Sequence, residues 1–363
     1  MTDDVDAWIA AGLYDPSAAN ANEILDLLRF LAEKGATVDD IVAAIAMDAV
    51  VAAASDLLLI EERTLSRDDI AERTGLTLDQ IDRAWLSLGL PPVGADGVMF
   101  SESDAVVLDA FVVGAELLGF EAALQFTRVL GSSLARIADA AVSGFLINVE
   151  GPLVDDHRPL VALAQASYDG TAILASLPQI FAPIFHRHSL LATMRTRKTR
   201  DASRGYAEFR LSVGFLDLVD FTAWSRELPV SELARAVNDF EEAASDLITE
   251  RGARLVKNIG DAVMFVAFDP TVACDIALDL CAYVDKHPAL TQLRGAVATG
   301  PLLSRDGDYF GPTVNLAARA VKFAEPGEVV SDQPVEGLES TALGQREVRG
   351  FDDPVELFVL RRL

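Results

Sequence analysis

Residues 209–222 read FRLSVGFLDLVDFT. Apolar residues alternate with other residues along the first half of this stretch, at Phe209, Leu211, Val213 and Phe215. Such alternation is typical of a β-strand with one buried face. Asp217 and Asp220 follow as the apolar alternation ends. The stretch therefore predicts a strand that carries acidic side chains at its end.

The residues that follow this strand contain both helical and strand patterns. We expect helices at 231–250, 271–284 and 314–323, and strands at 254–259, 263–268, 293–299, 328–331 and 355–360. Gly260 and Asp261 fall between the second and third strands, where a hairpin turn is expected. The order strand, helix, strand, strand, helix, strand is the ferredoxin-like order. Residues 207–363 are therefore expected to form an α+β domain.

Two further clusters of polar residues lie in this domain. Lys257–Asp261 reads KNIGD and covers the hairpin turn, and Asp308–Arg319 reads DYFGPTVNLAAR and leads into a helix. A single aspartate at a strand end is ordinarily a solvated residue, so no cluster is decisive alone. Two carboxylates on adjacent strands, Asp217 and Asp261, offer the hard oxygen ligands that Mg²⁺ and Mn²⁺ prefer beside phosphates.

Taken together and in this order, the three clusters resemble the catalytic domain of class III nucleotide cyclases, over Phe209 to Leu363. The resemblance implies an adenylyl cyclase, which converts ATP to 3′,5′-cyclic AMP and pyrophosphate. It implies that Asp217 and Asp261 hold two Mg²⁺ or Mn²⁺ ions. It also implies that Asn315 orients the ribose and that Arg319 stabilises the charge that develops at the α-phosphate.

Four more residues match family positions that contact the nucleotide. Lys257 and Asp308 match the two positions that read the base, where a carboxylate accepts from the adenine amino group and a lysine donates to a ring nitrogen. Guanine presents the opposite pattern on that edge, so ATP is expected and a guanylyl cyclase is the alternative. Arg349 and Arg305 are expected to contact phosphates, although either residue is equally consistent with a surface arginine.

The family resemblance carries one departure and one consequence. Asp220 stands where the family usually has a glycine that lets the backbone approach phosphate, and a third carboxylate there puts the catalytic rate in doubt. In the family, the metal carboxylates come from one catalytic domain and the other site residues from a second. Because this chain carries both sets in one domain, the resemblance implies a homodimer with two composite sites.

Residues 1–185 read as an all-helical domain. Within it, residues 66–104 resemble the helix-turn-helix of MerR-type regulators, but the expected recognition helix sets Asp79 and Asp82 against Arg83 alone, which favours a packing role over DNA reading. The domain resembles the regulatory domain ahead of some actinobacterial soluble cyclases. The alternatives are a transcription regulator and an interaction module, each with a catalytically weak cyclase-like domain. A diguanylate cyclase is disfavoured because its Gly-Gly-Asp/Glu-Glu-Phe run is absent.

The charge is strongly acidic and uneven. The net charge of the 363 residues is −26, yet residues 186–206 hold six bases and one acid, which predicts a basic linker between two acidic domains. A surface of this sign opposes nucleic-acid binding. An acidic N-terminus and the lack of an uncharged apolar run of membrane length predict a cytoplasmic chain with no span; Pro178 and Pro183 interrupt the nearest candidate. Cys274 and Cys281 are expected in the core.

Overall fold

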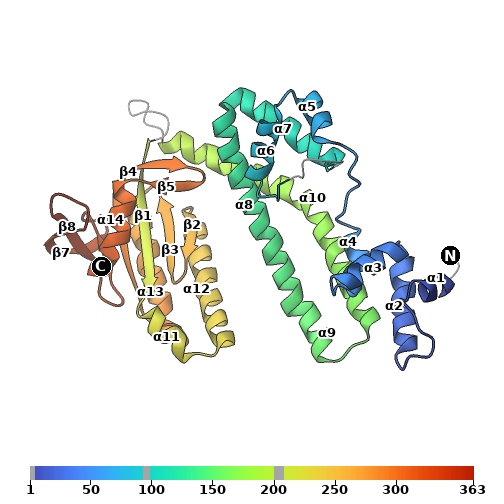
Figure 1. The fold of residues 1–363 in the computed structure, drawn as a ribbon. Coiled ribbons are helices and arrows are strands. Elements are labelled where there is room, and N and C mark those ends of the chain that lie inside the picture. Colours follow the sequence, from blue (N-terminus) through green and yellow to red (C-terminus); the bar gives the residue numbers. More distant parts are fainter. Residues whose placement is uncertain (1–4, 93–98, 200–207) are drawn as a thin grey trace. The chain divides into compact units, whose positions relative to one another are not determined.

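The computed structural model describes residues 5–92, 99–199 and 208–363. The chain divides into two compact units, Met1–Ser189 and Leu190–Leu363 (Figure 1). Residues 186–199 of the expected linker belong to a long helix, α10, and residues 200–206 lie outside the described residues.

The first unit is built from helices, as predicted. Its helical elements are α1 Val5–Ala10, α2 Ala21–Glu33, α3 Val38–Ala46, η1 Val50–Ala52, α4 Ala53–Asp56, α5 Arg67–Thr74, α6 Leu78–Ser87, α7 Glu102–Leu118, α8 Phe120–Phe145, η2 Leu146–Glu150, α9 Gly151–Asp155 and α10 Leu160–Thr199. In the described residues of this unit, the only β-type backbone pairing is an isolated antiparallel bridge between Leu65 and Phe100.

Local sequence explains where several of these helices begin. Four helices begin with a capping box, in which the side chain of the cap accepts from the backbone N–H three residues later, and the side chain of that later residue accepts from the backbone N–H of the cap. The four caps are Thr37, Ser66, Thr77 and Ser101. Gly75 ends α5 in the left-handed conformation, which glycine adopts without steric cost. Within residues 66–104, α5 and α6 are thus two short helices joined by a turn at Gly75.

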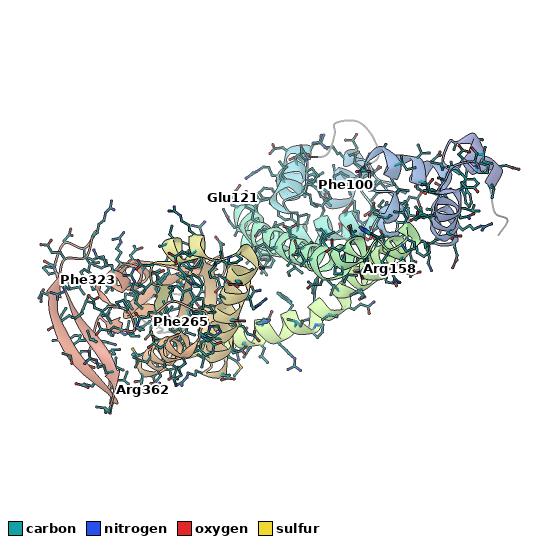
Figure 2. All side chains as sticks on the ribbon, turned by 90° about the horizontal axis from the view of Figure 1, so that it is seen from below. Phe100, Glu121, Arg158, Phe265, Phe323 and Arg362 are labelled. Carbon is teal, nitrogen blue, oxygen red and sulfur yellow. The ribbon has the colours of Figure 1, made fainter. Side chains whose placement is uncertain are left out.

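Two apolar cores hold the first unit together. One contains Trp8, Leu27, Leu31 and Ile41, which come from the first three helices. The other surrounds Phe100, which is fully buried among residues of α5 to α8 (Figure 2). The helix-turn-helix piece is part of this second core, which agrees with the packing role expected for it.

Two helical stretches, Phe120–Asp155 and Leu160–Arg197, are long and apolar enough to cross a membrane, judged by length and composition alone. Few of their residues are buried within the single chain. The expectation of no spanning segment therefore stays a prediction. Pro178 and Pro183 were expected to interrupt the apolar stretch, but the helical backbone of α10 continues through both prolines. Each proline removes one backbone N–H donor, and a long helix retains its other backbone hydrogen bonds.

The second unit has the predicted α+β order. Its strands are β1 Glu208–Leu218, β2 Arg254–Ile259, β3 Ala262–Ala267, β4 Leu293–Arg305, β5 Asp308–Phe310, β6 Val329–Ser331, β7 Leu338–Arg346 and β8 Val355–Arg362. Its helices are α11 Phe221–Glu227, α12 Val230–Glu250, α13 Pro270–Lys286, α14 Pro312–Ala320 and the turn η3 Val321–Phe323.

The sheet has the order β2-β3-β1-β4-β6-β8-β7, and β5 pairs with β4. The first four of these strands form the ferredoxin-like core, in which β1 pairs antiparallel with both β3 and β4. The predicted fold class is confirmed. A strand at 338–346 was not predicted, because its sequence LESTALGQR lacks apolar alternation and many of its side chains are exposed.

Apolar residues lie on both faces of this sheet. One core joins the sheet to α12 and α13 and includes Phe265, which is labelled in Figure 2. The ring of Phe265 occupies the space where a side chain at Gly214 would stand. Cys274 and Cys281 lie in this core as free thiols, as expected, and burial raises the pKa of each to about 12. A second core lies between the other face and α14.

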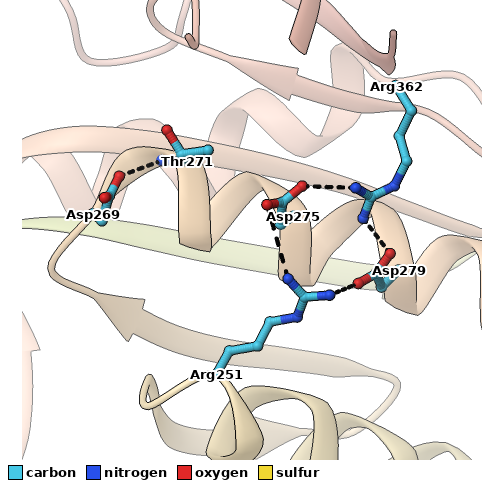
Figure 3. A network of polar contacts seen from close by, with 6 residues as sticks. All are labelled: Arg251, Asp269, Thr271, Asp275, Asp279 and Arg362. Atoms are coloured by element: carbon cyan, nitrogen blue, oxygen red, sulfur yellow. Dashed lines mark hydrogen bonds and ion pairs between the residues drawn. The ribbon is translucent and has the colours of Figure 1, made fainter. Parts of the chain in front are cut away.

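A network of four charged side chains joins the C-terminal strand to the helical face (Figure 3). Asp275 and Asp279 of α13 each contact both Arg251 and Arg362, with 3.0 Å from Arg362 Nη1 to Asp275 Oδ1. Arg251 follows α12 and Arg362 ends β8. All four are partly exposed, so we assign the network a modest share of the stability.

Asp332, directly after β6, is a largely buried carboxylate whose ionisation affects the stability of the fold. Both of its carboxylate oxygens accept from the backbone N–H of Thr299, at 3.1 and 3.2 Å, yet burial raises its pKa to about 6. Between pH 3.8 and about 6 the folded state keeps a proton that the unfolded state releases. The free energy of unfolding therefore falls as the pH rises through this window, and levels off above it.

We expect Asp332→Asn to remove this contribution, because an amide does not ionise. The difference in unfolding free energy between variant and wild type should change in favour of the variant by up to about 3 kcal/mol from pH 4 to pH 7. Denaturant unfolding of both proteins at a series of pH values measures it. A difference that is the same at every pH would contradict the assignment.

Candidate functional site

Asp217 and Asp261 lie side by side at one end of the sheet. Asp217 is near the end of β1, where it pairs with Ala262 of β3, and the N–H of Leu218 donates to the carbonyl of Asp261 at 3.1 Å. Partial burial raises the pKa of Asp217, and the adjacent charge of Asp261 raises it further. The pair therefore holds negative charge that a cation would stabilise.

Arg294 forms an ion pair with Asp217. It faces Asp217 across the β1–β4 register, with 3.3 Å between Nη2 and Asp217 Oδ2, and it partly opposes the rise of the pKa of Asp217. Its Nε atom is buried without a hydrogen-bond partner. Sequence reasoning missed Arg294, because only the strand register brings it opposite Asp217.

The carboxylate pair fits a divalent cation by its donor chemistry. Mg²⁺ and Mn²⁺ are often held by one or two carboxylates together with water and substrate phosphates. Within the described ranges, no group of three or more His, Cys, Asp or Glu side chains forms a complete metal cage.

Lys257 and Asp308 form a second group. Lys257 Nζ of β2 makes an ion pair with Asp308 Oδ2 of β5, and Asp308 Oδ1 accepts from the N–H of Tyr309 at 2.8 Å. Arg254 supports the same loop, since its Nη2 donates to the carbonyl of Gly307 at 2.7 Å and its guanidinium lies over the Tyr309 ring. The side chains of Lys257 and Asp308 thus lie together on the surface, where the lysine can donate and the aspartate can accept hydrogen bonds.

Asn315 and Arg319 form a third group, one helical turn apart on α14. Asn315 is exposed, whereas Arg319 is partly buried and donates from Nη1 to the carbonyl of Arg349. Thr313 fixes the start of the helix on the sheet, because its hydroxyl donates to the carbonyl of Pro301 at 2.8 Å.

The three groups remain separate within one chain. In the part of the chain that the structure describes, no hydrogen bond or ion pair joins Asp217 or Asp261 to either of the other groups. Arg305 is exposed and contacts Asp306 at 3.2 Å. The Arg349 side chain is exposed, and an open cavity of about 410 Å³ lies beside it. Within the described residues of one chain, the carboxylate pair therefore makes no contact of this kind with the other residues expected in the site.

Comparison with known families covers both units. Residues 6–159 match the adenylate cyclase regulatory domain, and residues 207–362 match the adenylate and guanylate cyclase catalytic domain. The chain is a class III nucleotide cyclase of the adenylate cyclase group. The predicted fold, family and enzyme class are therefore confirmed.

Two related proteins align with this chain over most of its length and most of their own. An uncharacterised protein of Mycobacterium tuberculosis is 34% identical over 98% of this chain and 94% of its own length. An adenylate cyclase of Glutamicibacter nicotianae is 32% identical over 85% of this chain and 82% of its own length. The crystal structure of the adenylyl cyclase CyaB from Pseudomonas aeruginosa is 23% identical, with a TM-score of 0.39, and covers 43% of this chain and 95% of that one.

The structure also explains the departure at Asp220. This residue has a φ of 54°, in the left-handed region that glycine adopts freely and that aspartate adopts more readily than most residues. Its side chain is exposed and makes no capping hydrogen bond to α11. In this cyclase the backbone conformation of a glycine is thus retained with an aspartate side chain directed to solvent.

Proposed function

We propose that this cyclase converts ATP to 3′,5′-cyclic AMP and pyrophosphate at composite sites in a homodimer. The observation that carries the proposal is that, among the described residues of one chain, no hydrogen bond or ion pair joins the carboxylate pair to the residues for base and ribose. Two copies related by a two-fold axis would bring unlike groups together twice. Family membership in a class of nucleotide cyclases supports the same assembly.

Asp217 and Asp261 would hold two Mg²⁺ or Mn²⁺ ions. Such ions, when bound, increase the acidity of the ribose 3′-hydroxyl and neutralise triphosphate charge. The chemistry forms a bond from the 3′-oxygen to the α-phosphorus and breaks the bond from that phosphorus to pyrophosphate. The hydroxyl proton leaves to solvent, so the reaction requires no other reactant.

The remaining residues bind and orient the nucleotide. Asn315 would hold the ribose so that its 3′-oxygen faces the α-phosphorus, since positioning is a large part of phosphoryl-transfer catalysis. Arg319 would stabilise the charge that develops on the α-phosphate. Arg349 and Arg305 would contact the outer phosphates, and their exposure supports contact with a ligand or a second chain.

Exposed apolar residues support the dimer. In α8 they include Phe126, Leu130, Leu134 and Ile137, and in α10 they include Ile173, Ile180 and Ile184. Monomeric proteins seldom leave so many apolar residues exposed in rows on neighbouring turns of a helix. A second copy of the chain would cover them, and the charges of Arg128, Arg136 and Asp139 on α8 favour this occupant over lipid.

The first unit would regulate the second, as its family match suggests. A role in DNA binding is disfavoured by the pairing of its arginines. Each arginine of α5 and α6 contacts an acid: Arg67 with Asp82, Arg73 with Glu102 and Asp109, and Arg83 with Glu121. Phosphate contacts would require breaking these pairs on an acidic surface.

We propose that the protein is located in the cytoplasm.

The base is the first test of this function. We expect kcat/KM for ATP to exceed that for GTP by about 100-fold or more, because guanine would leave Lys257 and Asp308 without correct partners. Lys257→Met should reduce this preference, whereas Lys286→Met, an exposed lysine on α13, should not. Cyclic nucleotide and pyrophosphate are measured with each substrate. Equal kcat/KM for the two nucleotides would show that Lys257 and Asp308 do not read the base, and a higher value for GTP would favour the guanylyl cyclase alternative.

A further inference from the structure

Residues Val348–Phe351 form a tight turn beside the catalytic helix α14. The N–H of Phe351 donates to the carbonyl of Val348 at 3.0 Å. Gly350 has a φ of 80°, whereas the φ of Arg349 is not positive. This combination defines a type II turn, which requires a positive φ at its third residue. The peptide at the centre of the turn is therefore the one that presents the Arg349 carbonyl.

That carbonyl accepts a hydrogen bond from Arg319 Nη1. A side chain at Gly350 would collide with the same guanidinium, because its Cβ would lie 2.5 Å from Nη1 and 3.5 Å from Cζ. The guanidinium therefore lies directly against the bare Cα of Gly350. The turn is fixed on the helix by Val348, which is buried in one apolar cluster with Leu316 and Ala317 of α14.

We propose that the 348–351 turn is a positioning element for Arg319. The inference rests on the role proposed above for Arg319 at the α-phosphate. The Arg349 carbonyl holds one N–H of the guanidinium, and Gly350 leaves the space that the guanidinium needs. An arginine has five donors, so four remain for substrate. A long side chain held before substrate arrives stabilises the transition state with less reorganisation than a mobile one.

A second turn of the same chain provides a matched control. In Val335–Leu338 the N–H of Leu338 donates to the carbonyl of Val335 at 3.2 Å, and Gly337 has a φ of 82°. A Cβ at Gly337 would meet no atom within 4 Å. Alanine therefore causes the same left-handed strain in both turns, and only at Gly350 does it also displace Arg319.

The experiment compares Gly350→Ala with Gly337→Ala in the full chain. Both should lower Tm by a similar amount. Only Gly350→Ala should lower kcat, by about 10²-fold or more, with KM for ATP changed less than about 3-fold. In the residual turnover that Arg319→Ala retains, Gly350→Ala should cause no further loss, because its effect acts through that side chain.

Equal kcat for the two alanine variants, together with an inactive Arg319→Ala, would overturn this inference and leave the proposed function standing. Full activity of Arg319→Ala would overturn the proposed role of Arg319 and this inference with it. If Gly350→Ala does not fold, the pair Gly350→Asn and Gly337→Asn repeats the comparison. Asparagine tolerates the left-handed region, yet its Cβ meets the same guanidinium.

Discussion

Asp217→Asn and Asp261→Asn are each expected to lower cyclic AMP formation by about 10³-fold or more. The physical reason is loss of the negative charge that would hold the divalent ions at the transferring phosphate. Both substitutions keep the size of the side chain and remove the repulsion that contributes to the raised pKa of Asp217. Asp217→Asn also removes the ion pair with Arg294, which opposes this gain. The Tm in the presence of a chelator should therefore change little.

Asp220→Asn is the matched control for this prediction. It removes a carboxylate three residues from Asp217 in a side chain that is exposed, and asparagine accepts the same φ of 54°. Its activity should equal or exceed that of the wild type. Thermal stabilisation by Mn²⁺ gives a readout independent of turnover, which Asp220→Asn should keep and the other two variants should lose. Near-normal turnover of either Asp217→Asn or Asp261→Asn would contradict the metal assignment.

Periodicity predicted most of the fold because most elements in this chain bury one face. The alternation in residues 209–215 and the hairpin at Gly260 and Asp261 correspond to β1, β2 and β3 of the structure. β7 was missed because it lies at the edge of the sheet with both faces partly exposed, so burial imposes no pattern on its residues. The long α10 was missed as one element because its basic end has the composition of a linker.

The candidate site was predictable in its residue types and not in its contacts. Local spacing predicts that Asn315 and Arg319 share a helix face, since the helical repeat alone determines this. The contact of Arg294 with Asp217 depends on the register of β1 and β4, over 77 residues of separation. The contact of Arg319 with the Arg349 carbonyl depends on how a distant turn docks on α14. A backbone acceptor has no sequence signature, so such a contact becomes visible only in the folded chain.

Complementation tests the composite site. Asp217→Asn and Arg319→Ala should each be inactive alone and should recover activity when mixed and allowed to exchange subunits. In the mixed dimer, one site receives both substitutions and the other receives neither. Random pairing of equal amounts makes half of the dimers mixed, so about a quarter of the wild-type specific activity is expected in the whole mixture and about half in a fraction that holds mixed dimers alone.

The matched control is a mixture of Asp217→Asn with Asp261→Asn. Both substitutions lie in the carboxylate pair, so every site of every dimer carries one of them and no activity should return. Subunit exchange is verified by co-purification through two different affinity tags, and cyclic AMP is measured in the doubly tagged fraction. If exchange occurs and Asp217→Asn with Arg319→Ala remains inactive, the two groups do not meet across a dimer. If the control mixture recovers equally well, the carboxylates do not come from the same chain, and the assignment of Asp217 and Asp261 to one half-site is wrong.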